Sequence, residues 1–326
     1  MRQAETWSEA QVRAVADIAP NVRMFEIAPS TPATSVPFGG HINVGVLANG
    51  RHDTRSYSLL GAQDGWYRIA VKRDREGRGG SEYMWSLKPG ARLIISNPRT
   101  NFPLDFGRPD YLLVAGGIGI TPLYGIALAL ARGANVRLAY AARNADDLAF
   151  LGELRSALGE RLTTHVSSRG QRPNLAALLE SVAPGGLAMI CGPLRMLDEA
   201  KRVWKALDRP VADLRFETFG SSGAHAPEPF TVRVPQLNRE ILVPENRSML
   251  EALAEAGVEV MSDCKRGECG VCAINVLSVE GTVDHRDVFF SEHQKSQNKK
   301  ICACVSRAIG TVTIDPLVRP DAPRPF

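Results

Sequence analysis

Apolar and polar positions alternate through much of the first hundred residues, which is the pattern of half-buried β-strands. In the segment 67–72 the larger apolar side chains occupy every second position. Turn-forming segments at 48–50 and 88–90 separate runs of this kind. We therefore predict a small antiparallel β-barrel for this part of the chain.

From about Gly107 the pattern changes to short apolar strands that alternate with helices. Strands are predicted at 111–115, 136–141 and 187–190. A helix is predicted from residue 122 to residue 132, with Thr121 as its N-cap and Gly133 at its C-terminal stop. Strands that alternate with helices indicate a parallel sheet.

Small residues fill the segment 220–227, which is a composition typical of linkers. The alternation of β-strands then returns at Phe230, Val232 and Val234. Ser248 and Glu251 form a capping-box pattern that predicts a short helix. Gly257 suits the end of that helix.

Together these patterns predict a multi-domain protein of the α/β plus β class. We place an antiparallel β-barrel domain at residues 1–106 and an α/β domain with a parallel sheet at 107–221. A linker follows at 222–229, and a β-rich domain at 230–326. A chain of 326 residues is long enough for domains with separate cores.

Composition and charge exclude several classes of function. The net charge of +4 is small for this length, so it gives no reason to expect nucleic-acid binding. The longest apolar run, 120–131, is much shorter than the about 20 residues that cross a bilayer. The N-terminus has no hydrophobic stretch of the signal-peptide type. We therefore expect a cytoplasmic protein that binds neither nucleic acid nor membrane.

Five of the six cysteines lie between positions 264 and 304, which points to metal or redox chemistry. Cys264, Cys269 and Cys272 have the C-x4-C-x2-C spacing of plant-type [2Fe–2S] centres. Such a centre needs four thiolates around two irons, and glycines in the loop let the backbone approach the sulfurs. Zinc ribbons use two close pairs of cysteines, which fits this spacing poorly. Structural cysteines without a metal are the remaining alternative.

The fourth ligand is Cys304 or Cys302. The spacing from Cys272 does not decide between them, because loop length varies in such sites. The distance to the predicted last strand, 311–314, favours Cys304. Cys302 remains the alternative.

Two segments of the first domain have residues that suit a flavin. We place Arg55-Ser56-Tyr57-Ser58 at the end of a β segment. Its arginine can pair with a phosphate, its tyrosine can lie along the ring, and a serine can bond the ring edge. The segment Gly77–Ser81 is predicted to begin a helix whose free amides face a phosphate. Taken alone, each segment also fits a polar surface strand or a hairpin tip.

A glycine-rich turn at 116–122 joins a predicted strand to a helix, where glycines let a pyrophosphate approach the helix N-terminus. Pro122 takes the last glycine position of G-x-G-x-x-G, so an ordinary dehydrogenase fingerprint is not supported. Cys191-Gly192-Pro193 follows another strand at the same edge of the sheet. Cys191 by itself is more typical of a core residue.

Together these segments resemble the phthalate dioxygenase reductase family, within the ferredoxin–NADP reductase superfamily. The resemblance covers nearly the whole chain and rests on residues 55–58, 77–81, 116–122, 191–193, 216–220, the cysteine loop and 304–308. It implies an FMN-binding barrel, an NADH-binding α/β domain and a C-terminal β-grasp plant-type ferredoxin domain, in that order. It also implies a monomer.

The resemblance implies roles for individual residues. The implied FMN contacts are Arg55, Ser56, Tyr57, Ser58, Ala70, Val71, Lys72, Gly79, Gly80, Ser81 and Phe219. Of these, Ser58 and Phe219 are expected beside the isoalloxazine ring. The implied NADH contacts are Gly116, Gly117, Gly119, Thr121, Arg143, Cys191, Gly192 and Pro193. The last cluster ligand of the family matches Cys304, and Cys302 is an extra cysteine. No acid or base residue is expected, since the flavin carries the hydride.

We therefore expect the NADH-dependent reductase component of a two-component Rieske aromatic-ring oxygenase or O-demethylase. Its electrons would pass from NADH through FMN and a [2Fe–2S] cluster to the oxygenase. NADH is expected rather than NADPH. A 2′-phosphate would be sensed near Arg143 and Asn144, where Asp146 and Asp147 would repel it.

Two other functions are compatible with the same motifs. One is an NADPH- or NADH-dependent flavin and iron–sulfur reductase of a non-Rieske monooxygenase, such as a diiron enzyme. Reductases of diiron enzymes usually have the ferredoxin domain first and use FAD. The other is a non-catalytic redox regulatory subunit, against which the complete segments 116–122 and 191–193 argue.

Overall fold

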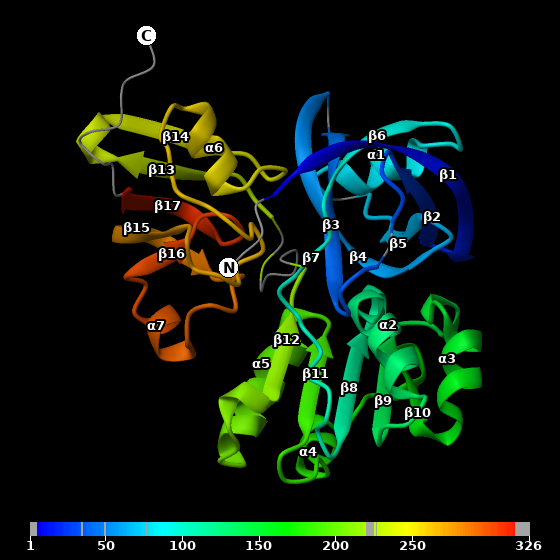
Figure 1. Ribbon diagram of the computed structural model, residues 1–326. Helices are drawn as coiled ribbons and strands as arrows, with labels where there is room; N and C mark the ends of the chain where they lie inside the picture. Colours follow the sequence, from blue (N-terminus) through cyan, green and yellow to red (C-terminus); the bar gives the residue numbers. More distant parts are fainter. Residues whose placement is uncertain are drawn as a thin grey trace. The chain divides into compact units, whose positions relative to one another are not determined.

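A computed structural model describes residues 5–33, 35–48, 50–75, 77–219, 225 and 227–316. The chain divides into two compact units, Met1–Glu217 and Thr218–Phe326 (Figure 1). The predicted linker at 222–229 falls just after this division. Its residues 222–224 and 226 lie outside the described part of the chain.

The first part of the first unit is an antiparallel β-barrel, as the alternation of apolar residues predicts (Figure 1). Its elements are β1 (Trp7–Ala19), β2 (Val22–Pro29), β3 (Gly40–Ala48), β4 (Arg51–Gln63), β5 (Trp66–Lys72), α1 (Gly80–Ser86), β6 (Arg92–Ser96) and β7 (Arg99–Thr100). The strands follow the order β4-β5-β2-β1-β6-β3-β7, and a further pairing of β3 with β4 closes the barrel. The most deeply buried core side chains include Phe25, Ile27, Ile42, Val44, Ile69 and Ile95.

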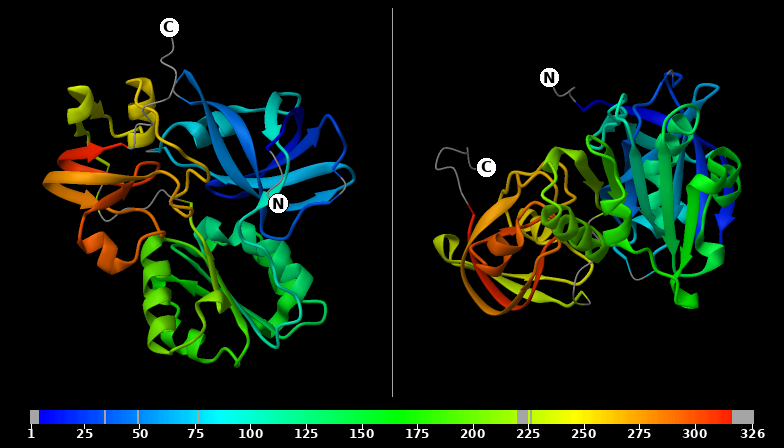
Figure 2. Two further views of the ribbon diagram at one scale, coloured as in Figure 1. Left: turned by 60° about the vertical axis from the view of Figure 1, so that its left-hand side comes forward. Right: turned by 90° about the horizontal axis from the view of Figure 1, so that it is seen from below.

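The second part of the first unit is a parallel sheet flanked by helices, which confirms the predicted α/β fold. Its elements are β8 (Tyr111–Gly116), η1 (Gly117–Gly119), α2 (Ile120–Leu130), β9 (Val136–Ala142), η2 (Ala145–Asp147), α3 (Leu151–Leu158), η3 (Gly159–Arg161), β10 (Leu162–Val166), η4 (Ser167–Arg169), α4 (Leu175–Glu180), β11 (Leu187–Cys191), α5 (Leu194–Ala206), η5 (Val211–Asp213) and β12 (Leu214–Glu217). All its strand pairs are parallel. Helix α2 packs with α3 and helix α4 with α5, one pair on each face of the sheet (Figure 2).

The order of the parallel strands determines where a ligand can bind. The sheet runs β10-β9-β8-β11-β12, so the direction of winding reverses between β8 and β11. Open α/β sheets bind ligands beyond the carboxyl ends of the strands at such a point. The residues at that point are Gly116 and Cys191, which end these two strands.

The predicted start of the helix after β8 is wrong by two residues. Helix α2 begins at Ile120, directly after the 3-10 turn η1, and Gly119 occupies its N-cap position. Thr121 lies within the first turn of the helix. It is buried, and its hydroxyl donates to the carbonyl of Ile118 at 2.9 Å.

The second unit is a mixed five-stranded sheet with a helix over it, which is the predicted β-grasp domain (Figure 1). Its elements are β13 (Phe230–Val234), η6 (Pro235–Leu237), β14 (Arg239–Val243), α6 (Met249–Glu255), β15 (Ala273–Asp284), α7 (Glu292–Ser296), β16 (Lys300–Cys302) and β17 (Arg307–Asp315). The order is β14-β13-β17-β15-β16, with β13 and β17 parallel. The predicted capping box is confirmed: Ser248 Oγ accepts from the Glu251 amide at 3.2 Å, and Glu251 accepts from the Ser248 amide.

None of the described helices has the length and apolar character needed to cross a membrane.

Candidate functional site

The segment Arg55–Ser58 lies in the interior of β4, and not at the end of a strand as predicted. It pairs with β3, where Asn43 stands opposite Ser56 and His41 opposite Ser58. Ser58 is buried, whereas Tyr57 is half-buried. Removal from water raises the pKa of the Tyr57 phenol, so this side chain stays neutral at physiological pH.

The structure brings Arg55 against the glycine-rich turn that precedes α1. The Arg55 guanidinium forms an ion pair with Asp53 and donates to the carbonyl of Arg78 at 3.3 Å. A Cβ added at Gly80 would lie 2.5 Å from Arg55 Nε, so glycine is needed for this approach. Gly79 has a φ of +80°, which also favours glycine. An arginine beside the amides of a glycine turn fits a phosphate group.

The other predicted flavin residues of the barrel differ in their access to a ligand. Ala70 and Val71 are buried in β5, whereas Lys72 is exposed at the end of that strand. Ser81 Oγ is already engaged in the turn, where it donates to the carbonyl of Asp74 at 3.1 Å and accepts from its amide. The backbone of the turn and Arg55 are therefore the best-placed groups for a phosphate.

We expect Arg55→Gln to weaken flavin binding by roughly 10- to 100-fold, because a hydrogen bond to a charged group is worth about 1.5–3 kcal/mol. The measurement is the dissociation constant of flavin for the apoprotein, followed by flavin fluorescence. Arg92→Gln, at the exposed first position of β6 in the same barrel, is the matched control and should retain wild-type affinity. Equal losses in both variants would show that Arg55 does not hold the phosphate.

At the switch point of the parallel sheet, glycines allow two turns to cross. A Cβ added at Gly119 would lie 2.2 Å from the Cys191 carbonyl oxygen, and one at Gly116 would lie 2.6 Å from Pro193 Cδ. A Cβ added at Gly192 would lie 2.8 Å from Met196 Sδ and 3.2 Å from Gly116 Cα. These glycines therefore serve the packing of the β8 turn on the β11 turn.

Gly117 differs from its neighbours because it has a φ of +56° and no atom within 4 Å of an added Cβ. Of the predicted nucleotide residues in this turn, it is the one that faces open space. Thr121 is buried with its hydroxyl bonded to Ile118, and Cys191 is fully buried at the end of β11. Pro193 is the N-cap of α5.

Beyond β9, Arg143 and Asn144 are exposed, as a nucleotide contact requires. Asn144 caps the turn η2: its amide donates to Asp147 Oδ2 at 3.1 Å, and its side-chain nitrogen donates to the same oxygen at 3.0 Å. The Asp147 carboxylate is thus used within the turn. Asp146 is exposed beside it.

The predicted segment 216–220 spans the division between the two units. Phe216 and Glu217 end β12, while Thr218 and Phe219 begin the second unit. Phe219 is partly exposed. Gly220 lies outside the described residues.

The cysteine loop joins α6 to β15, and its backbone is shaped by two glycines in left-handed conformation. Gly267 has a φ of +75°, and an added Cβ would lie 2.6 Å from Val305 and 2.9 Å from Asp287 Cα. Gly270, at +72°, lies against the Phe289 ring. This fold of the loop directs the amides of Arg266 and Glu268 to Cys264 Sγ, each at 3.4 Å.

Cys272, at the end of the cysteine loop, and Cys304, which follows β16, are in contact: their sulfurs lie 3.1 Å apart. The adjacent thiols of Cys302 and Cys304 lower the pKa of the Cys272 thiol. The same contact with Cys272 raises the pKa of Cys304, and the nearby Cys264 raises it further. The pKa of Cys302 is also raised, first by Cys272 and then by burial and by the charges of Asp287 and Cys304, whereas Cys264 does not act on it. Cys304 is therefore the thiol that lies near both Cys272 and the loop.

The donors fit an iron–sulfur cluster in chemistry: four cysteines, backbone amides directed at a sulfur, and a glycine-bearing loop. Over the described ranges, no group of three or more His, Cys, Asp or Glu side chains is arranged to hold a single metal ion.

Two carboxylates that support this loop were not found from the sequence. Asp287 is fully buried, accepts from Ser306 Oγ at 3.1 Å and from the Phe290 amide at 2.9 Å, and packs on Gly267. Burial would raise the pKa of Asp287, but the His285 ring, with Nδ1 3.5 Å from Asp287 Oδ1, and the hydrogen bond from the Phe290 amide outweigh it, and the pKa is lowered. Glu268 accepts from the Thr218 amide at 3.0 Å, and its pKa is raised by burial.

Three family descriptions match this chain, one for each part of the fold. Residues 9–103 match the oxidoreductase FAD-binding domain, and residues 113–202 match the oxidoreductase NAD-binding domain. Residues 232–308 match the 2Fe-2S iron-sulfur cluster binding domain.

The chain is also similar over nearly its full length to characterised proteins. It is 36% identical over 313 residues to the heme-dependent oxidative N-demethylase beta subunit of Ectopseudomonas mendocina, covering 94% of this chain and 97% of that one. It is 35% identical over 304 residues to phthalate dioxygenase reductase of Burkholderia cepacia, covering 89% and 91%. A solved phthalate dioxygenase reductase, described as a modular structure for electron transfer from pyridine nucleotides to [2Fe–2S], superposes with a TM-score of 0.74 at 32% identity, covering 95% and 98%.

Proposed function

This chain belongs to the phthalate dioxygenase reductase family, and on that premise we propose that it is the NADH-dependent reductase component of a two-component Rieske aromatic-ring oxygenase or O-demethylase. Its family makes it an electron-transfer oxidoreductase with a flavin, a nicotinamide nucleotide and a [2Fe–2S] cluster. The finer parts of the proposal are FMN as the flavin, NADH as the electron donor and a Rieske-type oxygenase as the acceptor.

The observation that carries the proposal is the contact between the sulfurs of Cys272 and Cys304 in the C-terminal domain. In the same chain this domain follows a flavin-binding barrel and a nucleotide-binding sheet. This order of domains places a site for a two-electron donor, the nicotinamide nucleotide, in the same chain as a cluster that passes on single electrons. The names of the relatives support an oxygenase as acceptor, since phthalate dioxygenase reductase serves a dioxygenase.

The residues of this chain act by positioning. When bound, the flavin supplies hydride acceptance and the cluster supplies single-electron transfer. Arg55 and the amides of the turn at Gly79 and Gly80 hold the flavin phosphate, and the neutral Tyr57 phenol lies along the ring. Gly117 leaves room for the nucleotide beside the switch point of the sheet. The amides of the cysteine loop stabilise thiolate charge at Cys264.

We expect a preference for NADH because the exposed Asp146 carboxylate repels a 2′-phosphate near Arg143. Asp146→Asn should raise kcat/KM for NADPH by roughly three- to fivefold and leave that for NADH unchanged, since exposed charges act with about 1 kcal/mol or less. Steady-state reduction of an artificial acceptor measures both values. Glu160→Gln, an exposed change in the same sheet domain, is the control. An equal rise in that control would rule out a specific role of Asp146.

Rapid mixing of the holoprotein with NADH tests the donor half of the proposal. Flavin absorbance should bleach first, followed by loss of cluster absorbance. A flavin that does not bleach would instead support a regulatory subunit. Mixing the reduced protein with a purified Rieske oxygenase then tests the acceptor half, with reoxidation of the cluster as the expected result.

A second acceptor is favoured by one specific observation. The relative from Ectopseudomonas mendocina is the beta subunit of a heme-dependent oxidative N-demethylase, which makes a heme protein the second candidate acceptor for this chain. The two candidates separate in a parallel assay, in which the reduced protein is mixed with a Rieske oxygenase and with a heme demethylase subunit. The physiological class of acceptor should be reduced at least tenfold faster at equal concentration.

A further inference from the structure

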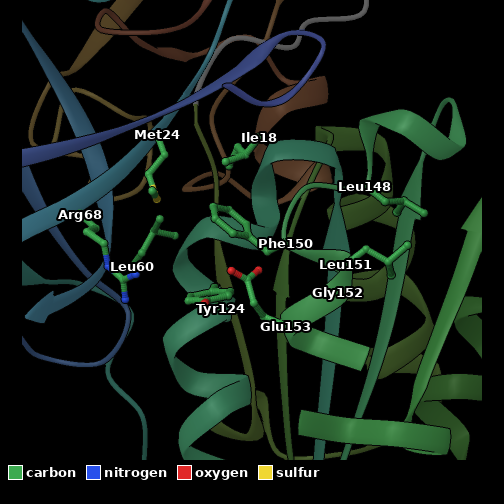
Figure 3. Close-up of a pocket in the computed structure, with 10 residues that line it drawn as sticks. All are labelled: Ile18, Met24, Leu60, Arg68, Tyr124, Leu148, Phe150, Leu151, Gly152 and Glu153. Atoms are coloured by element: carbon green, nitrogen blue, oxygen red, sulfur yellow. The ribbon is translucent and has the colours of Figure 1, made fainter. Parts of the chain in front are cut away.

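A cavity of about 380 Å³ lies between the barrel and the parallel-sheet domain of the first unit (Figure 3). Its barrel wall includes Met24 of β2, Leu60 of β4 and Arg68 of β5. Its opposite wall includes Tyr124 of α2 and Phe150 at the start of α3. This volume falls at the lower end of the range for small-molecule sites.

Two opposite charges line the cavity: Arg68 is half-buried, and Glu153 is exposed at its edge. Figure 3 shows the Arg68 guanidinium on the barrel wall and the Glu153 carboxylate on the helical wall, with the space of the cavity between them. Arg68 Nε is buried, and no described residue accepts a hydrogen bond from it. The described part of the chain offers neither Arg68 nor Glu153 an ion-pair partner within 4.0 Å. A buried guanidinium nitrogen without an acceptor is unfavourable, so an acceptor group of a ligand in the cavity would stabilise it.

The charges of Glu153 and Arg68 both act on the phenol of Tyr124. Burial raises the pKa of its phenol, the Glu153 carboxylate raises it further, and the Arg68 guanidinium lowers it. The phenol is therefore neutral at physiological pH and can both donate and accept a hydrogen bond. Its ring packs on Phe150 with 4.8 Å between centroids, which forms the apolar floor of the cavity.

The backbone at Phe150 is strained to complete this floor. Phe150 has a φ of +61°, a conformation that costs a residue with a bulky side chain about 1–3 kcal/mol. Leu148, two residues earlier, also lines the cavity. Strain of this kind is concentrated at ligand sites, where the surrounding structure holds it in place.

From this geometry we propose that the cavity binds a small zwitterion with an apolar body, of the apolar amino-acid class. The ligand carboxylate pairs with Arg68, its ammonium group pairs with Glu153 near the mouth, and its side chain packs on Phe150 and Leu60. A ligand with only a negative charge is repelled by Glu153, and one with only a positive charge is repelled by Arg68. The lining of the cavity includes no residue of the flavin turn at Gly79 or of the nucleotide turn at Gly117.

Calorimetric titration of the flavin-loaded protein, without NADH, tests this proposal with three probes, each of which contains the same phenyl ring. The probes are L-phenylalanine, 3-phenylpropanoate, which lacks the ammonium group, and phenethylamine, which lacks the carboxylate. We expect L-phenylalanine to bind roughly tenfold or more tightly than either singly charged probe. No binding of L-phenylalanine, or equal binding of all three probes, would overturn the proposal.

Two variants locate the binding. Arg68→Gln and Glu153→Gln should each lower the affinity for L-phenylalanine by roughly tenfold or more, while the exposed control Arg92→Gln leaves it unchanged. Flavin content and the melting temperature of each variant show that the first unit is folded. If Glu153→Gln binds L-phenylalanine as tightly as the unaltered protein, the ligand is not held as a zwitterion and the proposal fails.

Discussion

Replacing Cys304 with serine should abolish the [2Fe–2S] cluster, whereas replacing Cys302 should leave it in place. Cys304 Sγ lies 3.1 Å from Cys272 Sγ, and Cys264 also acts on the Cys304 thiol. Cys302 ends strand β16, opposite Ala273, and besides Cys272 its charged neighbours are Asp287 and Cys304, but not Cys264. The thiol that faces the loop is therefore the one whose loss leaves an iron without its ligand.

The loss of the cluster should stop electron transfer after the flavin and leave the reduction of the flavin by NADH intact. In Cys304→Ser, NADH should still bleach the flavin, because the barrel and the nucleotide-binding sheet belong to the other compact unit. Reduction of a one-electron acceptor that takes electrons from the cluster should fall by roughly 100-fold or more, since changes beside metal ligands alone cost 10- to 100-fold.

Iron and acid-labile sulfide per chain, the visible spectrum and the electron paramagnetic resonance signal of the reduced protein measure the cluster directly. Cys302→Ser is the matched control, because it removes a buried thiol two residues away. A full-strength spectrum in Cys304→Ser together with a lost cluster in Cys302→Ser would reverse the assignment of the fourth ligand.

The features predicted correctly from the sequence depend on short-range physics. The spacing of Cys264, Cys269 and Cys272 requires only that one loop wraps a cluster, and the 2Fe-2S domain that it predicts is confirmed, while the ligand assignment itself stays a prediction. The capping box of Ser248 and Glu251 joins residues three positions apart, and its hydrogen bonds are present in the structure. Alternation of apolar residues likewise predicts strands because successive side chains point to opposite faces.

The features that the sequence did not reveal depend on partners far apart in the chain. Asp287 is bonded to Ser306, 19 positions later, and Glu268 accepts from the Thr218 amide, 50 positions earlier. No local pattern distinguishes these carboxylates from exposed ones. A buried carboxylate between the cysteine loop and the last cysteines is recognised only once the fold brings those segments together.

The start of α2 shows how tertiary contact overrides a local preference. Thr121 has the chemistry of an N-cap, and Pro122 suits a first helical position. The close approach of Gly119 to the Cys191 carbonyl instead draws residues 117–119 into a 3-10 turn. The helix then begins one residue before Thr121, whose hydroxyl bonds within the turn.

Because Gly119 lies so close to the Cys191 carbonyl, Gly119→Ala should lower the free energy of unfolding of the first unit much more than Gly117→Ala does. The new Cβ at Gly119 would lie 2.2 Å from the carbonyl oxygen and 2.6 Å from the carbonyl carbon of Cys191, which are backbone atoms of strand β11. They cannot move without disturbing the sheet, so we expect a loss of about 3 kcal/mol. For a unit of this size, that lowers the melting temperature by roughly 6–12 °C.

At Gly117 the same methyl group meets no atom within 4 Å, so the effect is confined to the φ of +56°. The strain is about 1 kcal/mol, or roughly 2–4 °C. The methyl group would, however, enter the space proposed for the nucleotide, and KM for NADH should rise roughly tenfold with little change in kcat.

Flavin fluorescence on heating measures the melting of the first unit in both variants, and steady-state kinetics measures KM and kcat for Gly117→Ala. A Gly117→Ala protein with unaltered KM would place the pyrophosphate elsewhere at the sheet edge. A Gly119→Ala protein as stable as Gly117→Ala would mean that the β8 and β11 turns separate easily, and that glycine at position 119 is needed for the ligand and not for packing.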